Sequence, residues 1–176
     1  MRTMHTLTSG VKEKVEYYEE DESLVDAQER YYGEAETVSA VDRMSQAVWS
    51  GTAAKREGLA GVIVREDFKA VLRGTLPHTD ERIRWDNPNP DTKERLAHDV
   101  VLSAPKSISM ALHLEGDLRL FDAHTAAVQA TLDLIEQEVA QTRIQVNGFR
   151  SVVFTGNLIA ALIPHHTSRD GDMQLH

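Results

Sequence analysis

Two pairs of adjacent tyrosines are the first residues in the sequence whose type and spacing could support chemistry. Tyr17-Tyr18 and Tyr31-Tyr32 lie on either side of a strongly acidic segment. A phenol is a weak nucleophile at neutral pH unless a base or a metal-polarised electrophile assists it. Tyrosine pairs also commonly bury one ring and expose the other, so packing explains them as well as catalysis does. The tyrosines indicate a nucleophile only if the rest of a site lies elsewhere in the chain.

Two histidines near the C-terminal end provide half of such a site. The apolar run Leu158–Ile163 predicts a strand, so His165 lies at a strand end and His176 begins the next strand. A hairpin between them would bring the two imidazoles together as metal ligands. Isolated histidine pairs are more often surface residues, so a third ligand is needed. A histidine two residues beyond His176 would share its strand face, but the chain ends before that position.

An acid and two phosphate-compatible residues flank a predicted strand-to-helix turn. The strand is Leu96–Leu102, which contains Asp99, and the helix begins around Pro105. Asp99 could orient a histidine or accept a phenolic proton, and a solvent-facing acid is the alternative interpretation. Lys106 and Ser107 could bind phosphate oxygens at the helix start, although ordinary helix capping explains them equally well.

These candidate residues need a mixture of short helices and strands to position them. Helices are predicted over Val11–Tyr18, Val41–Trp49, the residues between Gly51 and Gly58, Glu66–Leu72 and Leu118–Gln141, and strands over Thr3–Thr8, Leu96–Leu102, Ser151–Phe154 and Leu158–Ile163. The longest helix has an apolar face that should pack across a sheet. Residues 77–92 predict a loop, and Asn147-Gly148 predicts a hairpin turn.

Composition limits the class of protein. The chain has 176 residues, of which 41% are hydrophobic, which suits one domain with a real core. It contains no cysteine, which excludes disulfides and thiolate metal sites and suits a reducing cytoplasm. No apolar run is long enough to span a bilayer and the N-terminus lacks a signal-peptide core, so we predict a cytoplasmic protein with no membrane partner. The formal net charge of −9 argues against binding nucleic acid by bulk electrostatics.

The order of these segments along the chain resembles the relaxase domain of MobF-class (TrwC/TraI-type) conjugative relaxases. The most specific matching segment is Asp99–Ser109. The others are both tyrosine pairs, Trp49-Ser50-Gly51 through Gly61, Phe68 to Gly74, Gly116-Asp117, Ala123-His124, Ala127-Val128, Thr155 to Leu158, His165, Thr167-Ser168-Arg169, Asp172 and Gln174-Leu175-His176. The resemblance implies an α+β fold with an antiparallel β-sheet flanked by helices (HUH relaxase-like), incomplete at the C-terminus.

The resemblance also implies roles for the tyrosines. In this family a tyrosine attacks the scissile phosphate of single-stranded origin-of-transfer DNA and leaves a 5′-phosphotyrosine and a free 3′-hydroxyl. Tyr17 is then the expected first nucleophile and Tyr31 serves a second strand transfer, with Tyr18 and Tyr32 as neighbours. The expected partners are single-stranded origin-of-transfer DNA and other relaxosome proteins. The acidic spacing between the pairs is longer here than in close relatives of this type.

A divalent metal ion, Mg²⁺ or Mn²⁺, is the cofactor that the resemblance implies. His165 and His176 match two of three metal-binding histidines, and Asp99 matches the acid that supports that site. The third ligand has no counterpart in the sequence. Lys106, Ser107 and Arg169 are the candidate DNA-binding residues.

We therefore expect one partial relaxase domain over residues 1–176, with a tyrosine-bearing region at 1–61 and a sheet and helix region at 62–176. The main hypothesis is nicking and strand transfer of DNA. The alternative is an inactive remnant that binds DNA or a protein. Metal affinity separates the two hypotheses, because two imidazoles hold a divalent ion less firmly than three. An unrelated His/Asp phosphohydrolase is a third hypothesis, but it leaves the paired tyrosines unexplained.

Overall fold

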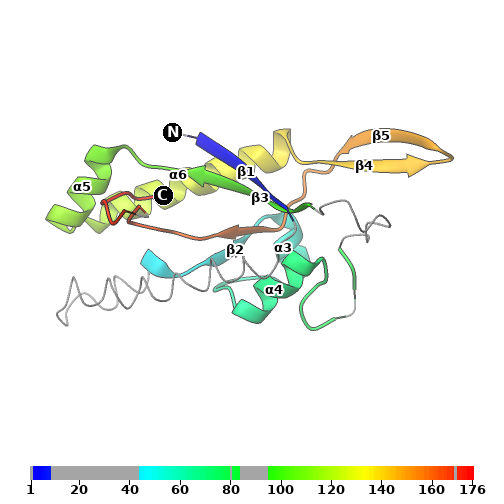
Figure 1. Cartoon of the computed structure of the whole chain (residues 1–176), viewed down its shortest axis with the longest axis horizontal. Coiled ribbons are helices and arrows are strands. Elements are labelled where there is room, and N and C mark those ends of the chain that lie inside the picture. The colour runs from blue at the N-terminus through cyan, green and yellow to red at the C-terminus, as the bar shows by residue number, and fades with distance from the viewer. Residues whose placement is uncertain (1, 9–43, 80, 84–94, 169) are drawn as a thin grey trace. The chain divides into compact units, whose positions relative to one another are not determined.

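The computed structural model describes residues 2–8, 44–79, 81–83, 95–168 and 170–176 (Figure 1). The chain divides into two compact units, and each is described by itself. The larger unit contains Met1, Asp42–Ile63 and Leu102–His176, and the smaller one contains Arg2–Val41 and Val64–Val101.

The smaller unit contains a two-stranded sheet and a helix. Strand β1 (Arg2–Thr8) pairs with β3 (Arg95–Leu102), and helix α4 spans Arg65–Arg73. The helix ends where Gly74 adopts the left-handed conformation, with φ 85°, and its N–H returns to the carbonyl groups of the last turn. The two strands and the helix that the sequence predicted here are confirmed.

The larger unit begins with a short strand that the sequence did not predict. Strand β2 (Val48–Ser50) pairs antiparallel with β6 (Ala160–Leu162), with Trp49 opposite Ala161. The helix predicted over Val41–Trp49 is wrong over residues 46–49. Pairing with a distant strand decides the conformation of the β-branched and aromatic residues Val48 and Trp49. Helix α3 (Thr52–Arg56) follows, as predicted.

Two consecutive helices form the framework of the larger unit. Helix α5 (Lys106–Glu115) ends at Gly116, which has φ 67°, and α6 (Leu118–Glu138) begins with Asp117 as its N-cap. The Asp117 carboxylate accepts the N–H of Arg119 at 3.1 Å. A small core joins these helices to the chain end and contains Met44, Leu112, Phe121 and Leu175. Both predicted helices are confirmed.

A long antiparallel ribbon follows α6. Strands β4 (Gln141–Val146) and β5 (Phe149–Phe154) form six residue pairs joined by Asn147 and Gly148, whose φ values are 51° and 83°. Positive φ at both turn residues is the geometry that an Asn-Gly hairpin requires. The predicted turn is confirmed, whereas β4 was not predicted.

The fold class is α+β with antiparallel strand pairs, as the sequence indicated. Within the described ranges, no helix is both long enough and apolar enough to cross a bilayer.

Candidate functional site

The two histidines expected to bind metal face each other across the C-terminal hairpin. The N–H of His165 donates to the carbonyl of His176, and the N–H of His176 donates to the carbonyl of His165, both at 2.8 Å. This reciprocal pair puts both side chains on one face of the ladder. Their imidazole centroids are 5.1 Å apart. The hairpin that the sequence predicted between these residues is present.

A β-bulge lies directly beside this pair. The next bridge joins Thr167 to Met173. Counted from the His165–His176 pair, this bridge is two residues along one strand and three residues along the other. Leu175 lies next to the hydrogen-bonded His165–His176 pair, so its N–H and carbonyl point away from the opposite strand. Its N–H donates instead to Ser109 Oγ at 3.0 Å, and its carbonyl accepts the N–H of Ala104 at 2.9 Å. Bulges redirect side chains locally, and this one precedes His176.

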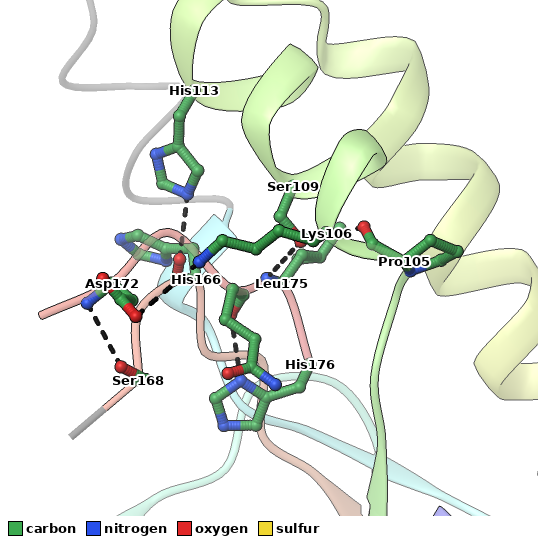
Figure 2. A network of polar contacts seen from close by, with 10 residues as sticks. Pro105, Lys106, Ser109, His113, His166, Ser168, Asp172, Leu175 and His176 are labelled. Carbon is green, nitrogen blue, oxygen red and sulfur yellow. Dashed lines mark hydrogen bonds and ion pairs between the residues drawn. The ribbon is translucent and has the colours of Figure 1, made fainter. Parts of the chain in front are cut away.

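One face of α5 holds both strands of the hairpin (Figure 2). On one strand, Ser109 accepts the N–H of Leu175. On the other, the carbonyl of His166 lies 2.9 Å from His113 Nε2, which must be the donor because a carbonyl can only accept. The same carbonyl accepts the N–H of Gln174 at 2.8 Å, so both of its lone pairs are engaged.

Burial keeps two imidazoles of the larger unit, those of His166 and His124, uncharged. Burial, followed by the neighbouring His113, His165 and His176, lowers the pKa of His166 to about 4. Burial, and then His176, also lowers the pKa of His124, although a hydrogen bond with the backbone of Leu102 opposes this. These groups are therefore neutral at pH 7 and do not repel a cation.

The tautomer of His176 is fixed by the chain itself. Its Nδ1 lies 3.0 Å from the carbonyl of Gln174, so Nδ1 carries the proton. Nε2 then keeps its lone pair, which is the arrangement commonly found in metal-binding histidines.

The geometry fits two ligands of one divalent ion. Two imidazoles bound to a tetrahedral ion at about 2.1 Å would have ring centroids about 5 Å apart. The observed separation between the rings of His165 and His176 is 5.1 Å. Among the described residues, no group of three or more His, Cys, Asp or Glu is arranged to hold a metal.

The other predicted site residues have different outcomes. Those outside the described residues are Tyr17, Tyr18, Tyr31, Tyr32 and Arg169. Asp99 is half-buried on β3, in the smaller unit, and its supporting role stays a prediction.

The two candidate phosphate-binding residues of α5 lie in its exposed first turn. Lys106 Nζ is 3.8 Å from the Asp172 carboxylate, and both side chains are exposed. Such a pair is weak, so it competes little with a phosphate for the ammonium group. Ser107 is exposed beside Lys106. The DNA-binding role of both stays a prediction.

Sequence reasoning missed Ser109 and His113. They are four residues apart on α5 and therefore share a helix face, which is the only signal in the sequence that could have linked them. Their partners are backbone groups of the hairpin, and no pattern of residue types reveals those.

A second polar cluster anchors α6 to α3 and to the loop before β6. The carboxylate of Glu136 is buried and accepts three hydrogen bonds, from Thr52 N at 2.8 Å, Thr52 Oγ1 at 2.9 Å and Leu158 N at 2.6 Å. The N-cap of α3 is Gly51, which has no side chain, so Glu136 supplies the acceptor that a capping residue would. On β2, Ser50 donates to Gln129 of α6 at 2.9 Å.

The β4–β5 ribbon has two chemically different faces. Cross-strand partners share a face, so Arg143, Gln145 and Arg150 lie together, on the same face as the exposed Val152 and Phe154. An open groove is lined by Arg143, Ile144, Gln145 and Arg150. The opposite face is apolar and carries Ile144, Val146, Phe149 and Val153, all exposed. Residues 139–164 contain these two arginines and no acid, in a chain with net charge −9. The cationic face is thus a local exception to the acidic composition.

Comparisons with known proteins agree with this arrangement. The model of the TrwC relaxase family matches residues 11–176. Two multifunctional conjugation proteins TraI, from Escherichia coli and from its strain K12, are 38% and 37% identical over 146 residues. Those matches cover 83% of this chain and 8% of each relative.

Several solved structures are also similar. The conjugative relaxase TrwC in complex with oriT DNA matches in a metal-free form, with a TM-score of 0.77 and 29% identity, and in a copper-bound form, with 0.80 and 30%. TrwC complexed with a 27-mer DNA comprising the recognition hairpin and the cleavage site matches with 0.75 and 28%. These matches cover 99% of this chain and 53%, 55% and 52% of those chains. The chain thus spans about half the length of the solved relaxases.

Proposed function

Because this chain belongs to the TrwC relaxase family, we propose that it nicks one strand of origin-of-transfer DNA and transfers it through a phosphotyrosine. The observation that carries the proposal is the paired His165 and His176, with rings 5.1 Å apart on one strand face. An imidazole pair at this separation suits two ligands of one divalent ion.

In the proposed reaction the Tyr17 phenolate attacks the scissile phosphorus. A bond forms between the phenolic oxygen and phosphorus, the bond from phosphorus to the 3′ oxygen breaks, and the leaving oxygen takes a proton to give a 3′-hydroxyl. Tyr31 performs a second transfer, with Tyr18 and Tyr32 beside the two nucleophiles. Asp99 is the supporting acid.

His165 and His176 would hold Mg²⁺ or Mn²⁺, which when bound polarises the phosphate oxygens. The Nδ1 hydrogen bond of His176 orients its ring, so that Nε2 is presented without a change of tautomer. Lys106, Ser107 and Arg169 are proposed to contact the phosphates of the single strand.

The cationic face of the β4–β5 ribbon is our proposed contact with the DNA next to the cleavage site. A two-stranded ribbon fits the major groove of a duplex, and arginine and glutamine read base edges there. TrwC was solved with DNA that includes a recognition hairpin, which contains a duplex of this kind. An acidic protein can bind DNA in this way because Arg143 and Arg150 are concentrated on one face. We also propose a cytoplasmic location, with other relaxosome proteins as partners.

The alternative function is DNA or protein binding without catalysis. The two functions differ in a covalent product, because binding alone leaves no phosphotyrosine.

The test is to incubate the chain with single-stranded origin-of-transfer oligonucleotides and Mn²⁺ or Mg²⁺, and to look for a covalent adduct on a denaturing gel. Tyr17→Phe should abolish the adduct, and His165→Ala should abolish its metal dependence. Tyr17→Phe retaining the full adduct would refute the assignment of the nucleophile. No adduct, together with salt-dependent binding of the same oligonucleotides, would favour the binding function.

A further inference from the structure

We propose that Ser109 and His113 of α5 are positioning residues that fix the orientation of the His165 and His176 imidazoles and so determine the affinity of the site for a divalent ion. This inference rests on the proposed metal site and identifies residues outside its ligands.

The first contact is made at Leu175, directly before His176. Leu175 is 1% exposed, and its N–H points away from the opposite strand of the hairpin. An unpaired buried N–H is costly, so the hydroxyl of Ser109, itself 0% exposed, is needed to accept it. The hydroxyl in turn donates to the carbonyl of Pro105 at 3.4 Å. Ser109 therefore stabilises the irregular backbone directly before His176.

His113 acts on the other strand. Its Nε2 donates to the carbonyl of His166, the residue directly after His165. The ring centroids of His113 and His166 are 5.7 Å apart. The hydrogen bond fixes the peptide plane between His166 and Thr167, one residue beyond His165. Because Ser109 and His113 lie four residues apart, one helix face contacts both strands of the hairpin (Figure 2).

Fixing both strands matters because two ligands bind one ion only at a narrow separation. A shift of either strand would change the 5.1 Å between the rings and the hydrogen bond that orients His176. Groups that orient metal ligands typically change metal affinity by roughly 10- to 100-fold when they are removed. Ser109 and His113 bind backbone groups beside the two ligands, so these contacts act on the imidazoles through the backbone.

The experiment uses four variants of the full chain, together with His165→Ala, which removes a proposed ligand. Ser109→Ala removes the acceptor, His113→Leu removes the donor, and His113→Gln keeps an N–H donor in a similar place. Met110→Ala, on the exposed side of the same helix, is the matched control. Dissociation constants for Mn²⁺ and Zn²⁺ are measured by titration calorimetry, and imidazole ¹⁵N NMR shifts report the tautomer of His176 in the metal-free protein. Circular dichroism verifies that each variant is folded at the chosen temperature.

We expect Ser109→Ala and His113→Leu to weaken metal binding by roughly tenfold or more and to mix the tautomers of His176. His113→Gln should recover most of the affinity, and Met110→Ala should match the wild type. Suppose that His165→Ala loses metal binding while the folded Ser109→Ala and His113→Leu variants bind metal as tightly as the wild type. This result would overturn the positioning role and support the metal site. Equal metal binding by the wild type and by His165→Ala would show that the proposed metal site is wrong. The tautomer of His176 in the metal-free variants would then decide whether α5 orients the His176 ring.

Discussion

The buried carboxylate of Glu136 should contribute more to stability than other acids of the same helix. It joins α6 to Thr52 of α3 and to Leu158 before β6 through three hydrogen bonds. Hydrogen bonds to a charged group contribute roughly 1.5–3 kcal/mol each, and bonds that share one acceptor are not additive. We therefore expect Glu136→Ala to lower the free energy of unfolding by about 3 kcal/mol.

Glu136→Gln separates geometry from charge. The amide oxygen can keep the bonds from the N–H groups of Thr52 and Leu158, and the amide NH₂ then faces Thr52 Oγ1, which can rotate to accept. All three contacts can survive, so the expected loss is only about 1 kcal/mol for the removed charge. Glu138→Gln, exposed at the end of the same helix, is the control and should stay within about 0.5 kcal/mol of the wild type.

Urea unfolding followed by circular dichroism measures these differences, with an unchanged m-value as the sign that the unfolded state is unaffected. A loss below about 0.5 kcal/mol in Glu136→Ala would show that the three bonds do not hold the junction. Equal losses in Glu136→Ala and Glu136→Gln would show that the charge matters and that the geometry of acceptance does not.

Three further predictions follow from other parts of the chain. Gly51→Ala should lower the free energy of unfolding, measured in urea, by about 2 kcal/mol or more, because φ is 101° and a Cβ would collide with the carbonyl of Leu158. Gly58→Ala, with φ 77° and open space around the Cβ, should lower it by only about 1 kcal/mol. The side-chain hydrogen bond from Arg119 lowers the pKa of Asp117. The contribution of this carboxylate to stability is therefore present above pH 3.8 and is lost as the pH falls through the lowered pKa. Arg119→Gln should raise the pKa of Asp117 in a ¹³C NMR titration. Arg143→Ala and Arg150→Ala should each reduce the slope of log affinity against log salt for duplex-containing DNA by about 0.9.

Each of these has an outcome that contradicts it. Equal losses of unfolding free energy in Gly51→Ala and Gly58→Ala would mean that the carbonyl of Leu158 does not lie close to Gly51. An unchanged Asp117 pKa in Arg119→Gln would assign the shift to another group. An unchanged salt slope in both arginine variants, with Arg56→Gln as the charge control, would place the DNA contact away from the ribbon.

Local signals in the sequence predicted much of this fold. Gly74 ends helix α4 because it adopts positive φ, and Asn147-Gly148 turns the ribbon for the same reason. The hairpin between His165 and His176 also followed from local strand and turn patterns. Strand β2 could not be predicted, because its three residues become a strand only by pairing with β6 from the far end of the chain.

The hairpin that carries the proposed metal ligands His165 and His176 is part of the hydrophobic core. Leu175 precedes His176 and packs with Leu112 and Phe121, while its N–H is bound by Ser109 from the same helix that provides Leu112. The side chain of one residue therefore contributes to folding, and its backbone to the orientation of a ligand. Because the hairpin is fixed by contacts that involve no metal, the two imidazoles are already at a suitable separation and binding needs little ordering of the chain. A change in the core, such as Leu112→Ala, should consequently weaken metal binding as well as stability, although Leu112 is no ligand.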